Sequence, residues 1–272
     1  DGFGLYQTTT RDGKRCSSAV AYLKPVRTRK NLKVITKATA SRIIFENGKA
    51  TALVYAVEGK GGFCEAAAKE IILCGGAVNS PQLLMLSGIG PAAHLKQFGV
   101  EVVADSPDVG GNLQDHLDVI VQWHCSQPVT LNNNSKFINK MKALGKWVFT
   151  RSGNGAHMPT PMGAFLSTRE GLAAPDIQMH FMPVRGNPHG RGTMDGRHGY
   201  QLHVCQLRPE SRGTIRLKSA DPLAAPAIDP NYLSAPEDVE TLVAASKASA
   251  VSAGPAVDAM DLVTGPTDKN FA

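Results

Sequence analysis

The segment that most constrains the fold joins an apolar run to a helix through two glycines. Glu70–Cys74 is a short apolar run typical of a buried strand. Gly75 and Gly76 follow it, and a missing Cβ there lets the backbone turn tightly or approach a ligand. Ser80-Pro81 suits the cap and first turn of a helix that ends at Gly88. This order of elements predicts a βα unit that brings its backbone close to a bound molecule.

The rest of the chain divides by its pattern. Asn47-Gly48 is a strong hairpin signal between the predicted strands 41–46 and 52–57. After residue 116, loops rich in Asn and Gly surround a helix predicted over 136–149, and alternating segments follow at 176–182, 200–207 and 214–217. These patterns predict an α+β fold, with a partial α/β domain over 1–116 and a domain with an antiparallel sheet over 117–272.

Composition excludes several classes of protein. The net charge of +6 would suit a nucleic-acid binder, but the basic residues are scattered and no aromatic residues interleave with them. We therefore expect a solvated basic face and no nucleic-acid partner. The five cysteines form no CxxC pair and the eight histidines show no zinc-binding spacing, so we expect no metal site. No apolar run is long enough to predict a transmembrane segment.

Four blocks of the sequence, in this order, resemble conserved segments of the glucose–methanol–choline (GMC) oxidoreductases. The block that starts at Gly75-Gly76 and ends in Ser87-Gly88-Ile89-Gly90 resembles the second signature of that family. The other blocks are Asp12–Leu23, Val109–His116, which resembles VGxNLQDH, and Ser211–Leu217 with Asp229–Leu233. Around His198–His203 the sequence is most similar to bacterial choline-type and aliphatic-alcohol dehydrogenases.

The resemblance implies that 1–116 is a partial FAD-binding domain and that 117–272 is a substrate-binding domain. It also implies FAD as cofactor and a small-molecule primary alcohol or choline-like compound as substrate, oxidised by hydride transfer to the flavin. The electron acceptor is left unidentified. The residues that the resemblance and the local pattern place at the cofactor are Ala40, Gly75, Gly76, Asn79, Ser80, Asn112, Asp115 and His116. A tight strand–helix junction explains the glycines and the cap without any ligand, and a hinge explains Asp115-His116. His180 and Phe181, on a predicted strand of the second domain, are candidates to line the substrate pocket.

Two family segments are not found in this sequence. One is the GxGxxG unit that holds the FAD diphosphate, and the other is the block that supplies the catalytic histidine. We therefore assign no catalytic residue and expect no turnover from this fragment alone. The alternative is a non-catalytic remnant of a degraded or split GMC gene, at most a weak nucleotide-binding module. For location we expect the cytoplasm or a peripheral site at the inner membrane.

Overall fold

The computed structural model describes residues 1–132, 137–156, 160–186, 197–252 and 260–263 and divides the chain into two units. The sheet unit comprises residues 1–29, 116–209 and 236–272, and the cavity unit comprises 30–115 and 210–235. The predicted boundary after residue 116 falls at one crossing between the units. The chain also crosses near residues 29, 209 and 235, so each unit is assembled from separate stretches of sequence.

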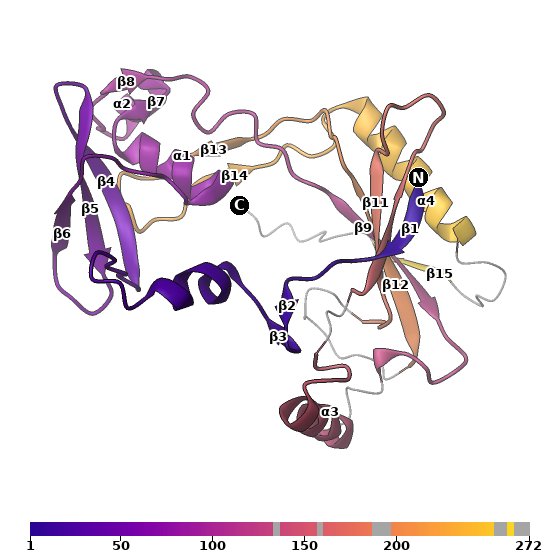
Figure 1. Ribbon diagram of the computed structural model, residues 1–272. Coiled ribbons are helices and arrows are strands. Elements are labelled where there is room, and N and C mark those ends of the chain that lie inside the picture. Colours follow the sequence, from indigo (N-terminus) through magenta and orange to yellow (C-terminus); the bar gives the residue numbers. More distant parts are fainter. Residues whose placement is uncertain (133–136, 157–159, 187–196, 253–259, 264–272) are drawn as a thin grey trace. The chain divides into compact units, whose positions relative to one another are not determined.

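The sheet unit is built on one antiparallel sheet, whose strands do not follow one another in sequence order (Figure 1). Its strands, in spatial order, are β1 (Gly2–Leu5), β10 (Met162–Leu166), β11 (Ile177–Met182), β12 (Gly199–Gln206), β9 (Asp118–His124) and β15 (Met260–Val263). The unit also holds α3 (Phe137–Thr150), α4 (Pro236–Ser252), the short pair β2 (Thr10–Arg11) and β3 (Lys14–Arg15), and helical turns at Ala19–Leu23 and Lys24–Val26. The predicted helix 136–149 and strands 176–182 and 200–207 are confirmed as α3, β11 and β12, to within a residue or two at their described ends. The segment 214–217, predicted for the same domain, forms a strand that belongs to the cavity unit and not to this sheet.

Alternation along the strands gives the sheet two different faces. Met179 and Val204 point to the face covered by α4, where they form a buried cluster with Ala245 of that helix. Residues one position away, such as His180 and His203, point to the opposite face because successive side chains of a strand alternate. The sheet therefore has one apolar face packed under a helix and one polar face.

In the cavity unit a three-stranded antiparallel meander lies beside a short helical layer. The meander is β4 (Ala38–Glu46), β5 (Lys49–Val57) and β6 (Phe63–Ala67), with the predicted hairpin at Asn47-Gly48. The other elements are α1 (Gly76–Leu86), β7 (Ile89–Gly90), α2 (Ala92–Gln97), β8 (Ala104–Asp105), β13 (Thr214–Arg216) and β14 (Ala227–Asp229). Met85, Leu95, Ile215 and Leu217 form its buried core.

Two local predictions around α1 were wrong. Glu70–Cys74 is not a strand, and Ile72 in it is 76% exposed. A strand requires a neighbour that accepts its backbone hydrogen bonds, and no strand in the described part of the chain pairs with this run. The helix begins at Gly76 with Gly75 as its cap, so Ser80 does not cap it and Pro81 lies inside the helix.

Candidate functional site

A cavity of about 750 Å³ in the cavity unit gathers most of the predicted cofactor residues. Ala40 reaches it from β4, whereas Gly75, Asn79 and Ser80 reach it from the start of α1. These two segments are more than thirty residues apart in the sequence. The volume lies within the range of roughly 300–1,000 Å³ that is usual for small-molecule sites. The structure thus brings together four of the predicted residues at one place that can receive a ligand.

The two glycines at this junction have different roles. A Cβ on Gly75 would lie 3.0 Å from both the Cβ of Asn79 and the backbone nitrogen of Ser80, so a small residue is needed for the chain to enter α1. Gly76 has a φ of +73°, where an L side chain is strained, but nothing lies within 4 Å of its missing Cβ. The tight junction therefore accounts for Gly75, whereas Gly76, also predicted at the cofactor, is exposed and does not line the cavity.

The chemistry of the cavity favours an uncharged ring system. Apolar side chains such as Leu53 and Leu83 make most of its wall, and polar groups come from Thr39, Asn79 and Ser80. Among the described residues that line it, none carries a charge. The apolar walls suit the faces of an aromatic base, and no cationic side chain lines the cavity to pair with a diphosphate.

One wall of the cavity was not predicted from the sequence. The segment Pro222–Pro226 and Ile228 close it from β14 and the loop before that strand. Gln82 of α1 ties this wall in place, because its Nε2 donates to the carbonyl oxygen of Ala224 at 2.9 Å. The loop has no periodic pattern or motif that would have predicted this contact.

Asn112, Asp115 and His116 do not line this cavity. Asn112 is exposed, in the left-handed backbone region with a φ of +53°. Asp115 accepts a hydrogen bond from the hydroxyl of Tyr232. Burial and this carboxylate raise the pKa of Tyr232 to about 12. His116 belongs to the other unit, where its Nε2 lies 3.2 Å from the carbonyl oxygen of Leu207. The division between the units thus separates the sequence neighbours Asp115 and His116.

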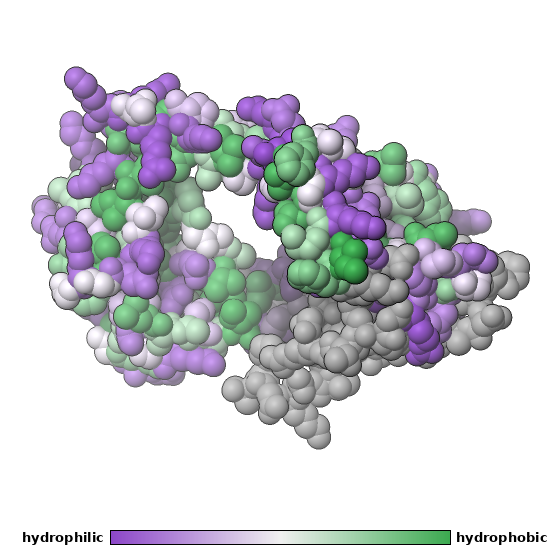
Figure 2. All heavy atoms as spheres, turned by 90° about the horizontal axis from the view of Figure 1, so that it is seen from below, coloured by the Kyte–Doolittle hydropathy of each residue, from purple (hydrophilic) through white to green (hydrophobic). Residues whose placement is uncertain are grey.

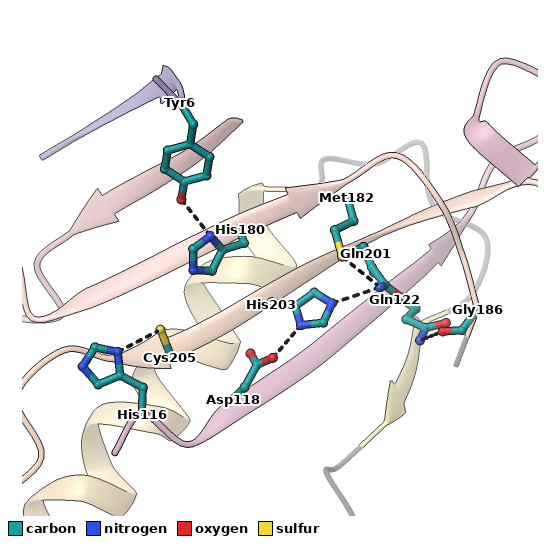
Figure 3. A network of polar contacts seen from close by, with 10 residues as sticks. All are labelled: Tyr6, His116, Asp118, Gln122, His180, Met182, Gly186, Gln201, His203 and Cys205. Carbon is teal, nitrogen blue, oxygen red and sulfur yellow. Dashed lines mark hydrogen bonds and ion pairs between the residues drawn. The ribbon is translucent and has the colours of Figure 1, made fainter. Parts of the chain in front are cut away.

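His180 lies on the polar face of the sheet unit, in a chain of polar contacts (Figure 3). Its Nδ1 is 2.9 Å from the hydroxyl oxygen of Tyr6, to which Gln178 also donates at 3.3 Å. Burial lowers the pKa of His180; the carboxylate of Asp118 opposes that shift, and His203 and His116 add to it. The imidazole is therefore neutral at pH 7, and no described residue bonds its Nε2.

Next to His180, a second histidine joins a carboxylate and an amide. His203 is the cross-strand partner of His180, and its Nδ1 lies 2.5 Å from Oδ2 of Asp118. The amide nitrogen of Gln201 is 2.9 Å from its Nε2. Because the amide donates to Nε2, the imidazole proton lies on Nδ1 and faces Asp118. None of these three residues was predicted as a site residue, although alternation along 200–207 places Gln201 and His203 on one face.

This polar face also holds acceptors without donors. Oδ1 of Asp118 and Oε1 of Gln201 are buried and have no hydrogen-bond partner among the described residues. A buried acceptor left unpaired costs about 1–3 kcal/mol. Both oxygens are buried, so they mark incompletely satisfied packing on this face and are not open to a molecule at its surface.

Phe181 cannot share a pocket with His180 on this sheet. The ring of Phe181 lies on the α4 side, 5.6 Å from the ring of Tyr200, in an apolar groove that Met162 and Leu202 also line. Adjacent strand residues point to opposite faces. The two predicted substrate residues are therefore separated, and only His180 lies among polar groups.

The neutral state of His180 gives a pH prediction. In an NMR titration its imidazole should take up a proton with a midpoint below pH 6.5, because protonation must occur in a half-buried site. The unfolded chain binds that proton more readily, so His180 contributes stability above pH 6.5 that is lost as the pH falls through its folded value. Tyr6→Phe should leave the pKa of His180 lowered, since burial is the main cause of the shift. A midpoint at or above 6.5 in the unaltered chain would contradict this account.

Residues 1–118 match the N-terminal sequence profile of the GMC oxidoreductases, and residues 209–271 match the C-terminal profile. The chain belongs to the GMC oxidoreductase family. The resemblance predicted from the sequence blocks is therefore confirmed, and members of this family bind FAD.

Among curated relatives of this GMC chain, the oxygen-dependent choline dehydrogenase of Brucella anthropi is 44% identical over 238 residues, which cover 88% of the chain and 43% of the relative. The mitochondrial choline dehydrogenase of Homo sapiens is 43% identical over 240 residues, covering 88% and 40%. The chain thus spans less than half the length of these relatives.

Solved structures agree with the α+β fold. Pyridoxine 4-oxidase from Mesorbium loti superposes with a TM-score of 0.78 at 27% identity, over 99% of this chain and 50% of that one. A formate oxidase gives a TM-score of 0.83 at 22% identity, over 92% and 48%. At that lower identity the likeness shows the fold alone. In the helices that the structure describes, none is long and apolar enough to cross a membrane, and no described group of His, Cys, Asp and Glu is arranged to hold a metal ion.

Proposed function

We propose that this chain is part of an FAD-dependent oxidoreductase that oxidises the CH–OH group of a primary alcohol or choline-like compound. The observation that carries the proposal is the meeting of Ala40 with Gly75, Asn79 and Ser80 at one uncharged cavity. When bound, the flavin accepts the hydride. The reaction is proposed for the whole protein, because the chain covers less than half of its choline dehydrogenase relatives.

In this proposal the cavity takes the adenine end of FAD. The apolar walls supplied by Leu53 and Leu83 suit the faces of a base, and the side chains of Thr39 and Asn79 offer hydrogen bonds to its edge. The diphosphate would lie outside the cavity, because no described lining residue is charged.

The polar face of the sheet unit is proposed to receive the alcohol. Neutral His180 presents Nε2 as a hydrogen-bonding group, and Tyr6 fixes the ring through Nδ1. Oδ1 of Asp118 and Oε1 of Gln201 are buried without a partner, so they would accept from a substrate hydroxyl only after the side chains that cover them shift. His203, held between these two residues, orients them and need not touch the substrate. These residues therefore bind and position the alcohol, and none of them is assigned as the catalytic base.

The test is binding of FAD and of adenosine to the chain, measured by equilibrium dialysis. Both ligands should bind weakly and with similar affinity, because the cavity contacts the base and not the diphosphate. Ala40→Trp should fill the cavity and weaken both affinities by roughly tenfold or more, since the indole occupies the volume of the base.

Ala67→Trp is the matched control. Ala67 lies on β6 of the same meander opposite Ala52, on the side away from the cavity residue Leu53, and it does not line the cavity. Binding that Ala40→Trp leaves unchanged would remove the cavity from the proposal. Failure of both ligands to bind the unaltered chain would favour the non-catalytic remnant instead.

A further inference from the structure

The loop that forms one wall of the cavity begins at a histidine contact that the proposed function does not use. This loop, residues 217–226, joins β13 to β14, and its second half, Pro222–Pro226, lines the cavity. At its first residue, the backbone amide of Leu217 donates a hydrogen bond to Nε2 of His94 at 3.0 Å. His94 lies on α2, 123 residues earlier in the chain. One side chain thus fixes the start of a loop whose other end carries the wall.

Packing holds this wall only weakly. Leu223 is 67% exposed and Ile228 is 52% exposed, so neither side chain is fixed in a core. On the cavity unit, at the left of Figure 2, apolar residues lie at the surface among hydrophilic ones. Two hydrogen bonds tie the loop to helix side chains in the described part of the chain, one from Gln82 of α1 and one to His94 of α2. The position of the wall therefore depends on these two bonds.

His94 can accept this hydrogen bond only while its imidazole is neutral. A neutral imidazole carries its proton on one nitrogen, and because the Leu217 amide donates to Nε2, that proton lies on Nδ1. Protonation adds a hydrogen to Nε2, which then becomes a donor that faces another donor. Leu217 is 4% exposed, so its amide would be left without an acceptor in a buried place. The bond therefore breaks when His94 takes up a proton.

The surroundings of His94 favour the neutral form. Its ring packs edge-on against the ring of Phe98, with centroids 5.1 Å apart. Burial lowers the pKa of His94, and the guanidinium of Arg216 on β13 lowers it further. The other charged residues of the neighbouring helix, strands and loop are Lys96, Asp105, Lys218 and Asp221. The bond is therefore complete above pH 6.5 and is lost as the pH falls through the lowered pKa of His94.

We propose that His94 is a pH-sensitive latch of the cavity: when its imidazole takes up a proton, the loop 217–226 loosens and the cavity loses affinity for its ligand. His94 is the only histidine among residues 30–115 and 210–235, all of which the structure describes. Histidine is the side chain that ordinarily changes its charge near neutral pH, so a pH effect on this unit can be traced to one residue. The effect on the loop stands apart from the proposed function, whereas the effect on affinity rests on the cavity taking the adenine end of FAD.

NMR of the complete chain tests the latch without any ligand. Long-range proton–nitrogen spectra of the imidazole should show the Nδ1–H tautomer of His94 at neutral pH. The protection factor of the Leu217 amide, which corrects for the intrinsic pH dependence of hydrogen exchange, should fall by roughly fivefold or more as His94 titrates, the equivalent of one lost hydrogen bond. An Nε2–H tautomer, an unchanged protection factor, or an imidazole that stays neutral until the chain unfolds would overturn the proposal.

His94→Gln gives a latch that does not titrate. The amide oxygen of glutamine can take the place of Nε2 as acceptor, so the Leu217 amide should stay protected at every pH. His124→Gln is the matched control, because it makes the same change on β9 of the sheet unit and should leave the pH dependence as it is. A pH dependence that persists in His94→Gln would assign the effect to another group and contradict the latch.

Equilibrium dialysis with adenosine tests the effect on the cavity. Adenosine is uncharged over the range in which His94 titrates, so a change in affinity comes from the protein. The affinity of the unaltered chain should fall by roughly fivefold or more across that titration, and the affinity of His94→Gln should not change. By linkage, bound adenosine should in turn lower the pKa of His94. An affinity that does not follow the titration would overturn the effect on the cavity. If adenosine binds at no pH, the proposed function fails, while the exchange of the Leu217 amide still decides whether the latch exists.

Discussion

Trp123→Ala is expected to destabilise the sheet unit by about 3–5 kcal/mol, the range for removing a large aromatic side chain from a core. Trp123 is 2% exposed on β9, and its ring stacks on Tyr200 with centroids 5.2 Å apart. The strand is paired on both sides, by β12 and β15, so the backbone cannot move inward to fill the space. The lost contacts and the remaining cavity therefore both lower the free energy of unfolding.

Urea unfolding followed by tryptophan fluorescence measures this effect. The chain has two tryptophans, and the second, Trp147, belongs to the same unit and stays as the reporter. Phe165→Ala is the control, because Phe165 lies on β10 of the same sheet but is 42% exposed. Its loss should be well under half that of Trp123→Ala. Similar midpoints for the two variants would show that Trp123 does not lie in a packed core.

Much of the sheet unit was predictable, because a strand with one buried face shows alternating apolar and polar residues in its own sequence. The predicted strand 176–182 matches β11. Its alternation places His180 on the polar face of the sheet and Phe181 on the face covered by α4. The pairing of β1 with β10 was not predictable, since Gly2–Leu5 meets a strand about 160 residues later in the chain. The contact of Asp118 with His203 was missed for the same reason. No local pattern records which distant strands become neighbours.

At the cavity, the resemblance to the GMC family predicted residues that the periodicity of the sequence could not. Ala40 is an unremarkable strand residue by local pattern, and only the family likeness selected it as a neighbour of Gly75 and Asn79. The apolar run Glu70–Cys74 shows the opposite case. Its composition predicted a buried strand, but whether a strand forms depends on a pairing partner, which composition does not specify. The wall at Pro222–Pro226 depends on one side-chain contact from Gln82, and a single such contact leaves no pattern in the sequence.

Gly110→Ala is expected to destabilise the cavity unit by about 3 kcal/mol or more, of which the left-handed backbone accounts for about 1–2 kcal/mol. The φ of Gly110 is +72°, and a Cβ there would lie 2.2 Å from the carbonyl oxygen of Ile215. The amide of Ile215 donates to the carbonyl oxygen of Gly110 at 2.7 Å, so the two segments are held face to face. Because Ile215 belongs to the buried core with Met85 and Leu95, separating the segments would also loosen that core.

Gly99→Ala separates the two causes. Gly99 has a φ of +69°, close to that of Gly110, but nothing lies within 4 Å of its missing Cβ. It should therefore show the backbone penalty alone, about 1–2 kcal/mol. Urea unfolding followed by circular dichroism gives the two losses, and hydrogen exchange locates them. The amide of Ile215 should exchange faster in Gly110→Ala and stay protected in Gly99→Ala, since only the first substitution separates it from its acceptor. Equal losses with equal protection would mean that the backbone conformation, and not the close approach to Ile215, is the reason for glycine at position 110.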